Sequence, residues 1–157
     1  MKLLFKQRFF SWLDSYDIFD ERGSTAYTVE GRLAWGHKLV ISDPLGEEVG
    51  VVREQALAFL PRFTISVRGK EVGEICKEFT FFRPSFRLRG LDWKIQGNFM
   101  EWDYRITDGA GRTVAQVSKE LFHWTDTYSM EIDREEDALY VLMIVLAIDA
   151  AKCSAGH

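Results

Sequence analysis

The segment from Ala138 to Ile148 constrains the fold of this 157-residue chain more than any other, because every position in it is apolar. As a helix it has no polar face, and a helix that is hydrophobic all round belongs in a membrane or in a protein core. Eleven residues rise only about 16 Å, whereas a membrane span needs about 20 apolar residues. We therefore expect a helix buried in the chain's own core, with Asp149 emerging near one end.

Acidic residues precede this segment and predict where the helix begins. Asp133 can serve as its N-cap, and Glu135, Glu136 and Asp137 suit the positive end of the helix dipole. The same acidic cluster could bind a divalent cation. A solvated helix start is the preferred interpretation, and no metal site is predicted.

The rest of the chain carries a repeated hairpin signal. Asp-x-x-Gly stands between β-branched stretches at Asp20–Gly23, Asp43–Gly46 and Asp108–Gly111, and a shorter turn stands at Arg68-Gly69. Asp tolerates turn conformations and Gly supplies a positive φ, so each pattern predicts two antiparallel strands joined by a tight turn.

The hairpins group into two halves. Asp43, Gly46, Val49 and Val52 fall on Asp108, Gly111, Val114 and Val117 at one shift of about 65 residues. We expect one domain over 1–157, with a first half 1–80, a second half 81–132 and a central helix 134–150. Chance remains the alternative, since such turns are common in β proteins.

The spacing of these signals predicts a mainly β fold, with about twelve antiparallel strands closed into a barrel around the C-terminal helix. Gly50, Gly73 and Ala115 are expected on the inner wall, where small side chains would let the helix approach. The strands are expected at 3–10, 15–19, 26–31, 38–42, 48–54, 62–67, 71–78, 85–89, 92–97, 103–107, 113–119 and 127–132.

Charge and cysteine content narrow the class of protein. The net charge is −4, so nothing in the overall charge favours nucleic acid. The two cysteines form no disulfide framework, and the N-terminal apolar run is interrupted at Lys6, as a signal peptide would not be. The expected location is the cytoplasm, with association at a membrane surface left open, and integral membrane insertion is not expected.

Several motifs together resemble the LURP-one-related family, and bacterial members resemble this chain over essentially its whole length. The motifs are Gly97-Asn98-Phe99, Asp103-Tyr104, Val114–Lys119, Phe122–Tyr128 and the closing Val145–Asp149. The family is similar in fold to the tubby C-terminal domain and to phospholipid scramblases. The resemblance implies a twelve-stranded barrel around a hydrophobic helix. It supplies no established enzymatic activity to carry over, and the tubby-like relatives of the family bind phosphoinositide head groups.

No catalytic or cofactor-binding pattern stands out in the sequence. The histidines lack metal-ligand spacing, the cysteines lack a nucleophile context, and the serines lack a nucleophile elbow. We interpret the histidines as structural and Cys76 as structural or incidental, and no catalytic role is predicted for any of these residues. They are His37, His123, His157, Cys76, Cys153, Ser118 and Ser129.

The best candidates for contact with an anion are Arg83, Arg87, Arg89 and Lys94. Arg87 and Arg89 share one face of a predicted strand, so two guanidinium groups could meet one phosphate. An ordinary exposed strand face would look the same. The leading hypothesis is a non-enzymatic binding module for an anionic ligand, such as a lipid head group, or for a protein. The alternative is a structural or homo-oligomerising protein, and an enzyme comes third.

Overall fold

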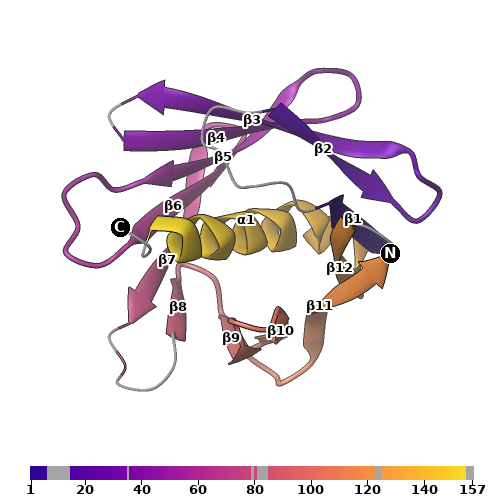
Figure 1. The fold of residues 1–157 in the computed structure, drawn as a ribbon. Helices are drawn as coiled ribbons and strands as arrows, with labels where there is room; N and C mark the ends of the chain where they lie inside the picture. Colours follow the sequence, from indigo (N-terminus) through magenta and orange to yellow (C-terminus); the bar gives the residue numbers. More distant parts are fainter. Residues whose placement is uncertain (7–14, 35, 79, 81–84, 123–124, 155–157) are drawn as a thin grey trace.

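Twelve antiparallel strands and one long helix form the architecture, seen here in a computed structural model (Figure 1). The structure describes residues 1–6, 15–34, 36–78, 80, 85–122 and 125–154. A short 3-10 turn, η1 (Glu135–Asp137), leads into the helix α1 (Ala138–Ser154). The strands are β1 (Lys2–Lys6), β2 (Ser15–Asp20), β3 (Thr25–Ala34), β4 (Gly36–Ser42), β5 (Glu48–Glu54), β6 (Arg62–Val67), β7 (Lys70–Glu78), β8 (Ser85–Arg89), β9 (Trp93–Asn98), β10 (Asp103–Asp108), β11 (Thr113–Phe122) and β12 (Thr125–Ile132).

All twelve strands belong to one sheet, in the order β8-β7-β6-β5-β4-β3-β2-β1-β12-β11-β10-β9. β1 lies between β2 and β12, with Leu3 in register with Asp20 on one side and Met130 on the other. This pairing curls the sheet into a nearly closed barrel, and its two edge strands are β8 and β9. The predicted fold class, a mainly β barrel of twelve antiparallel strands with a C-terminal helix, is confirmed. The strand at 3–10 extends to Lys6, and positions 7–10 lie outside the described residues.

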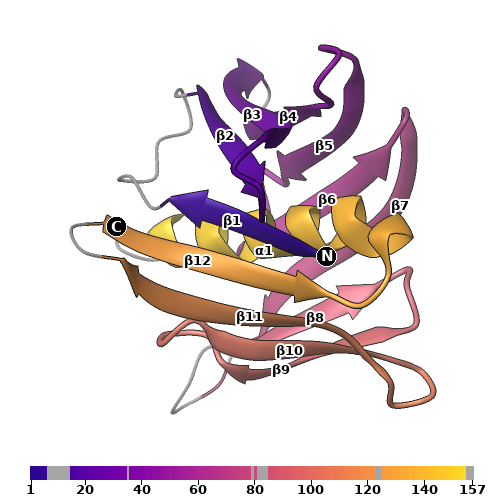
Figure 2. The ribbon, with the colours of Figure 1, turned by 90° about the vertical axis from the view of Figure 1, so that its right-hand side faces the viewer.

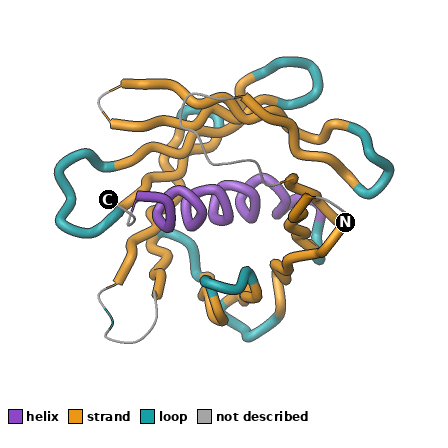
Figure 3. The backbone as a smooth tube through the Cα atoms, in the orientation of Figure 1, coloured by secondary structure: helices purple, strands orange, loops and turns teal. Residues whose placement is uncertain are grey.

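The helix α1 runs through the interior, and the strands surround it in both ribbon views and in the tube (Figures 1, 2 and 3). Val141 to Ile148 are each at most 1% exposed. The barrel wall thus removes every face of this stretch from water, as its uniform hydrophobicity requires, while Leu139 and Tyr140 at the start of the helix are half-buried. No helix in the described part of the chain is both long and apolar enough to cross a membrane. Asp149 does not emerge at an end: it is 4% exposed, because α1 continues past it to Ser154.

A missing side chain lets α1 lie close to the wall at β5. A Cβ atom added to Gly50 would stand 2.9 Å from the sulfur of Met143 and 3.4 Å from Cδ1 of Leu139. The expected role of small residues is thereby confirmed at Gly50. At Gly73 the neighbour is different, since a Cβ there would meet the backbone oxygen of Arg89 at 2.8 Å.

The three Asp-x-x-Gly turns adopt one geometry. Each aspartate accepts hydrogen bonds from the backbone amides two and four residues later at 2.9–3.0 Å. The glycines Gly23, Gly46 and Gly111 have φ values of +82°, +81° and +83°, a region that favours glycine. The repeated sequence signal therefore marks a real repeated hairpin turn.

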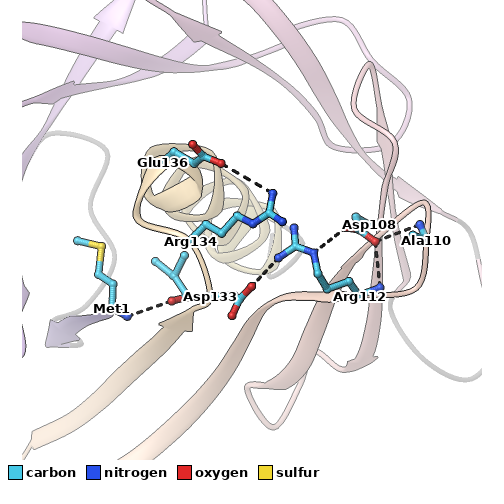
Figure 4. A network of polar contacts seen from close by, with 8 residues as sticks. Met1, Asp108, Ala110, Arg112, Asp133, Arg134 and Glu136 are labelled. Carbon is cyan, nitrogen blue, oxygen red and sulfur yellow. Dashed lines mark hydrogen bonds and ion pairs between the residues drawn. The ribbon is translucent and has the colours of Figure 1, made fainter.

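The approach to α1 is fixed by ion pairs rather than by a side-chain cap (Figure 4). Arg112 contacts Asp133 at 2.5 Å and Asp108 at 3.0 Å, so it links the β10–β11 turn to the end of β12. The predicted N-cap role of Asp133 is wrong, because its carboxylate faces this guanidinium and α1 begins only at Ala138. Arg134 lies 3.9 Å from Glu136 in the same connection.

Candidate functional site

The barrel sheet is interrupted between β8 and β9, and we call this line the seam. β8 pairs with β7 and β9 pairs with β10, but within the described residues no strand pairing joins β8 to β9. The two strands are consecutive and are connected by residues 90–92. They lie at the lower side of the barrel in Figure 1. The seam therefore leaves two backbone edges without a strand partner in a sheet that is otherwise continuous.

The predicted anion contacts lie on both edges of the seam. Arg87 and Arg89 are exposed on β8, whereas Phe86, which precedes Arg87, is 4% exposed and faces the core, and Leu88 between the arginines is half-buried. Lys94 is exposed on β9, on the opposite edge. Arg83 lies outside the described residues. The structure thus brings two of the four cations onto one strand face and places a third across the seam, and their role as ligand contacts stays a prediction.

Carboxylates of the described residues do not occupy Arg87, Arg89 or Lys94, so these side chains can contact a ligand. On the outer face beside β8, Arg62 forms an ion pair with Glu74 at 2.7 Å. None of the ion pairs within the described residues involves Arg87, Arg89 or Lys94. The one carboxylate in register with Arg89, that of Glu74, is already paired. Arg87, Arg89 and Lys94 outnumber the one acidic residue of the connection between the strands, Asp92, so the seam has an excess of positive charge on a protein whose net charge is −4.

Aromatic contacts close the inside of the seam at its two ends. Phe86 on β8 meets Phe99, just after β9, with ring centroids 5.0 Å apart in an edge-to-face arrangement. At the other end Trp93 on β9 meets Tyr140 on α1 at 6.1 Å, also edge to face. These pairs seal the core where no backbone ladder does. Leu88 and Leu91 add half-buried apolar surface beside them.

A buried polar cluster lies at the C-terminal end of α1, and sequence reasoning missed it. The cluster consists of Asp149, Lys152, Trp102, Tyr104 and Tyr128. Trp102 stacks on Tyr128 with centroids 3.9 Å apart, and the Lys152 ammonium stands 4.0 Å from the Trp102 ring centroid. The Tyr104 hydroxyl is fully buried and has no hydrogen-bond partner among the described residues. In the sequence, the one indication of this cluster is Asp149, a single charged residue that follows an apolar helical segment.

Burial raises the pKa values of the acidic groups in this cluster. Removal from water raises the pKa of Asp149 to about 7, and the Lys152 ammonium opposes that rise. Burial also holds the pKa of Tyr104 well above its ordinary value, with the Asp149 charge adding to the effect. The most strongly shifted carboxyl group in the described chain therefore lies inside the barrel rather than in an exposed cleft.

An open groove of about 370 Å³ lies beside the start of β1. Its lining includes Lys2, Glu21, Glu131 and Asp133. Lys2 is paired with Glu120 at 2.7 Å, which raises the pKa of Lys2 through their hydrogen bond. Carboxylates outnumber unpaired cations in this groove, so it is less suited than the seam to an anion.

The remaining candidate residues have structural surroundings. His37 contacts Glu54 at 2.7 Å, and the thiol of Cys76 lies 3.2 Å from the Glu74 carboxylate. Burial is the main cause of the raised pKa of Cys76, which disfavours a reactive thiolate. Among the described residues no group of three or more His, Cys, Asp or Glu side chains is arranged to hold a metal ion. His123 and His157 lie outside the described residues.

Comparisons with known proteins agree on one family and one fold. The family model LURP-one-related matches residues 1–149. The uncharacterized protein YxjI of Bacillus subtilis is 34% identical over 150 residues, which cover 95% of this chain and 92% of that protein. An X-ray structure of a protein from Arabidopsis thaliana has a TM-score of 0.65 at 17% identity, covering 95% of this chain and 90% of that one.

Proposed function

This chain belongs to the LURP-one-related family, and from that premise we propose that it is a non-enzymatic module that binds an anionic ligand at the seam. One observation carries the proposal: Arg87 and Arg89 on β8 and Lys94 on β9 are exposed at facing edges and take no part in the ion pairs of the described residues. Arg83 stands next to β8 in the sequence and is included in the proposal.

The chemistry of these side chains suits a phosphate or carboxylate. Arg87 and Arg89 are two residues apart on one strand, so their Cα atoms are about 7 Å apart, and side chains of this length allow both guanidinium groups to converge on one anion. The guanidinium group stays charged at every physiological pH and donates two parallel hydrogen bonds to such a group. The proposed location is the cytoplasm, where lipid head groups and soluble phosphate compounds are both accessible.

The position of Asp149 supports the non-enzymatic part of the proposal. A general acid or base needs to reach the proton of its substrate. Asp149 is 4% exposed and is surrounded by barrel side chains, so its raised pKa follows from enclosure in the core.

Vesicle flotation tests the proposal. Vesicles of phosphatidylcholine alone are compared with vesicles that also contain phosphatidylserine or a phosphoinositide, and soluble inositol phosphate is added as a competitor. Arg87→Glu with Arg89→Glu should abolish binding to the anionic ligand, and added salt should weaken it. Arg22→Glu with Arg53→Glu changes the net charge equally at exposed positions away from the seam.

The outcomes separate the sources of the anion. Binding to anionic vesicles that inositol phosphate does not displace favours a membrane surface, and binding to the soluble compound favours a free phosphate. If neither is bound and no acidic peptide is bound either, or if both double variants behave alike, the proposal is wrong.

The free edges favour a second candidate, a homo-oligomer joined through β8 or β9. Unpaired strand edges are sites at which another chain can pair. Light scattering over a range of concentrations tests this candidate. A molar mass that rises with concentration supports it, and a constant monomer mass contradicts it.

A further inference from the structure

We infer that the free edge of β8 accepts an extended peptide as an added β-strand, and that this peptide carries acidic residues at every second position. The inference rests on the proposed function, since it names the class of anion that the seam binds. Three features of the described residues carry it: the backbone edge of β8, the two arginines on its outer face, and the half-buried apolar side chains inside the seam.

The backbone of β8 offers one side for pairing. Its five residues are in register with Glu74 to Glu78 of β7, and its other side faces the seam without a strand partner among the described residues. In a strand, successive N–H and C=O groups point to opposite edges, so the seam-side groups of β8 are not used by β7. An extended peptide laid along that side would satisfy them, as in other cases of strand addition.

The outer face of β8 specifies the charge of the added strand. Arg87 and Arg89 point to the same face, and the side chains of a neighbouring strand repeat at the same two-residue spacing. Acidic residues at alternate positions would therefore stand beside both arginines. Glu74, on the opposite side of β8, is already paired with Arg62 and does not take this place.

The inner face specifies apolar residues at the positions between. Leu88 of β8 alternates with the arginines, and Leu91 and Trp93 lie next along the chain; all three are half-buried and pack against the core. Inward side chains of an added strand would cover this surface and gain the free energy of burying it. The partner is thus an alternating acidic and apolar peptide rather than a uniformly acidic one.

β8 suits this partner better than β9 does. β9 carries one outward cation, Lys94, and contains Gly97 at a φ of +142°, where the backbone departs from ordinary strand geometry. A lipid head group could contact the arginines, but it would not pair with the seam-side N–H and C=O groups of β8. The backbone edge is the reason that an extended peptide is favoured over a head group.

Fluorescence anisotropy with labelled peptides and the full chain tests the inference. The probe is a short peptide of alternating valine and glutamate. Its controls are a peptide of the same composition with the glutamates grouped together, and a peptide of alternating valine and lysine. The alternating acidic peptide should bind about tenfold or more tightly than either control. Arg87→Glu with Arg89→Glu should remove this preference, whereas Arg22→Glu with Arg53→Glu should leave it.

Backbone methylation distinguishes strand pairing from charge attraction. In an extended strand the amides of all the glutamates point to one edge and those of all the valines to the other. One peptide is N-methylated at the glutamates and a second at the valines. If the peptide pairs with β8, one of these should bind about as tightly as the parent and the other at least about tenfold more weakly.

The outcomes separate this inference from the proposed function. Equal binding by both methylated peptides, or by the grouped peptide, overturns strand addition while the arginine-dependent binding of an anion still stands. If the protein binds anionic vesicles but does not bind the alternating peptide, strand addition is likewise overturned and the proposed binding of an anion still stands. If the double variant at Arg87 and Arg89 changes the binding of neither vesicles nor peptide, both the inference and the proposed function are wrong.

Discussion

A carboxyl group inside an apolar core carries a charge only at a large cost in free energy, so it tends to keep its proton. Asp149 is in this situation: its pKa is raised from 3.8 to about 7, chiefly by burial. The groups that face it are the Lys152 ammonium, which favours its charged form, and the Tyr104 hydroxyl. Near neutral pH this one side chain therefore exists in both protonation states.

The stability of the fold should depend on pH through Asp149. Between about pH 4 and about pH 7 the folded protein keeps a proton that the unfolded chain releases, so the free energy of unfolding falls as pH rises, by at most about 4 kcal/mol, and levels off above pH 7. Asp149→Asn cannot ionise and should flatten this slope. Urea unfolding at about pH 5 and about pH 8 measures it.

Glu71→Gln is the matched control for Asp149→Asn, because it removes one exposed carboxyl group from β7. It should leave the slope as it is in the parent protein. Identical slopes for the parent and Asp149→Asn would show that Asp149 ionises freely in the folded state.

The close contact between Gly50 of β5 and the helix α1 can be tested by substitution. Gly50→Val should lower the free energy of unfolding by about 1–3 kcal/mol, because its new atoms would meet Met143 and Leu139. Met143→Ala alone should also destabilise the fold by leaving a cavity. In the double variant the loss measured in urea should be smaller than the sum of the two, and strict additivity would contradict the contact.

At the scale of elements, the last turns of α1 are tied to the turn between β9 and β10. Lys152 donates a hydrogen bond to the backbone oxygen of Phe99 at 2.5 Å and lies over the ring of Trp102. Trp102 has a φ of +52°, a conformation that side chains seldom adopt without support from their surroundings. The helix end thus holds in place a turn that its own backbone preferences do not favour.

Lys152→Met should weaken the contact between the end of α1 and the β9–β10 turn. Methionine keeps most of the apolar contact but loses the hydrogen bond and the attraction to the indole ring, so the free energy of unfolding should fall by about 1–3 kcal/mol. Urea unfolding followed by tryptophan fluorescence measures the change. Lys70→Met, at an exposed position at the start of β7, should have little effect, and equal losses in the two variants would contradict the role of Lys152.

The strands and their order along the chain could be predicted because hairpin turns are local. Asp108 and Gly111 fix a turn within four residues, and alternation along Thr113–Phe122 marks the strand that follows. Contacts between distant residues could not be predicted in this way. The sequence predicts Asp133 as a helix cap, and this prediction is wrong because its partner, Arg112, is brought to it only by the pairing of β11 with β12. The duplication of the two halves stays a prediction.

At the scale of the whole molecule, the barrel has two edges that meet at the seam. Amides that point into the seam from β8 and β9 lack a strand partner among the described residues, whereas those of β5 are enclosed between β4 and β6. Hydrogen exchange followed by NMR should therefore find fast exchange at alternate residues of β8 and β9 and slow exchange throughout β5. Uniform protection along β8 would show that its free edge is paired in solution.

The candidate site shows where sequence reasoning stops. The common outward face of Arg87 and Arg89 follows from the two-residue period of a strand and could be predicted. Their position at an edge could not, because a sequence does not say which neighbouring hairpins fail to pair. Charged side chains are found on many edge strands, but the exposed face of a central antiparallel strand carries them as well, so the alternation of Arg87 and Arg89 does not mark an edge.

The pairing of β1 with β12 also determines when the chain can fold during synthesis. Lys2 of β1 is in register with Glu131 of β12, which comes 129 positions later in the sequence, and α1 follows still later. A ribosome that adds about 5–20 residues per second would complete the first strand several seconds before its partner. Until then the barrel cannot close and α1 is not yet present in its interior. The growing polypeptide would therefore expose unpaired strands. We expect chaperones that shield such strands to associate with it before its release.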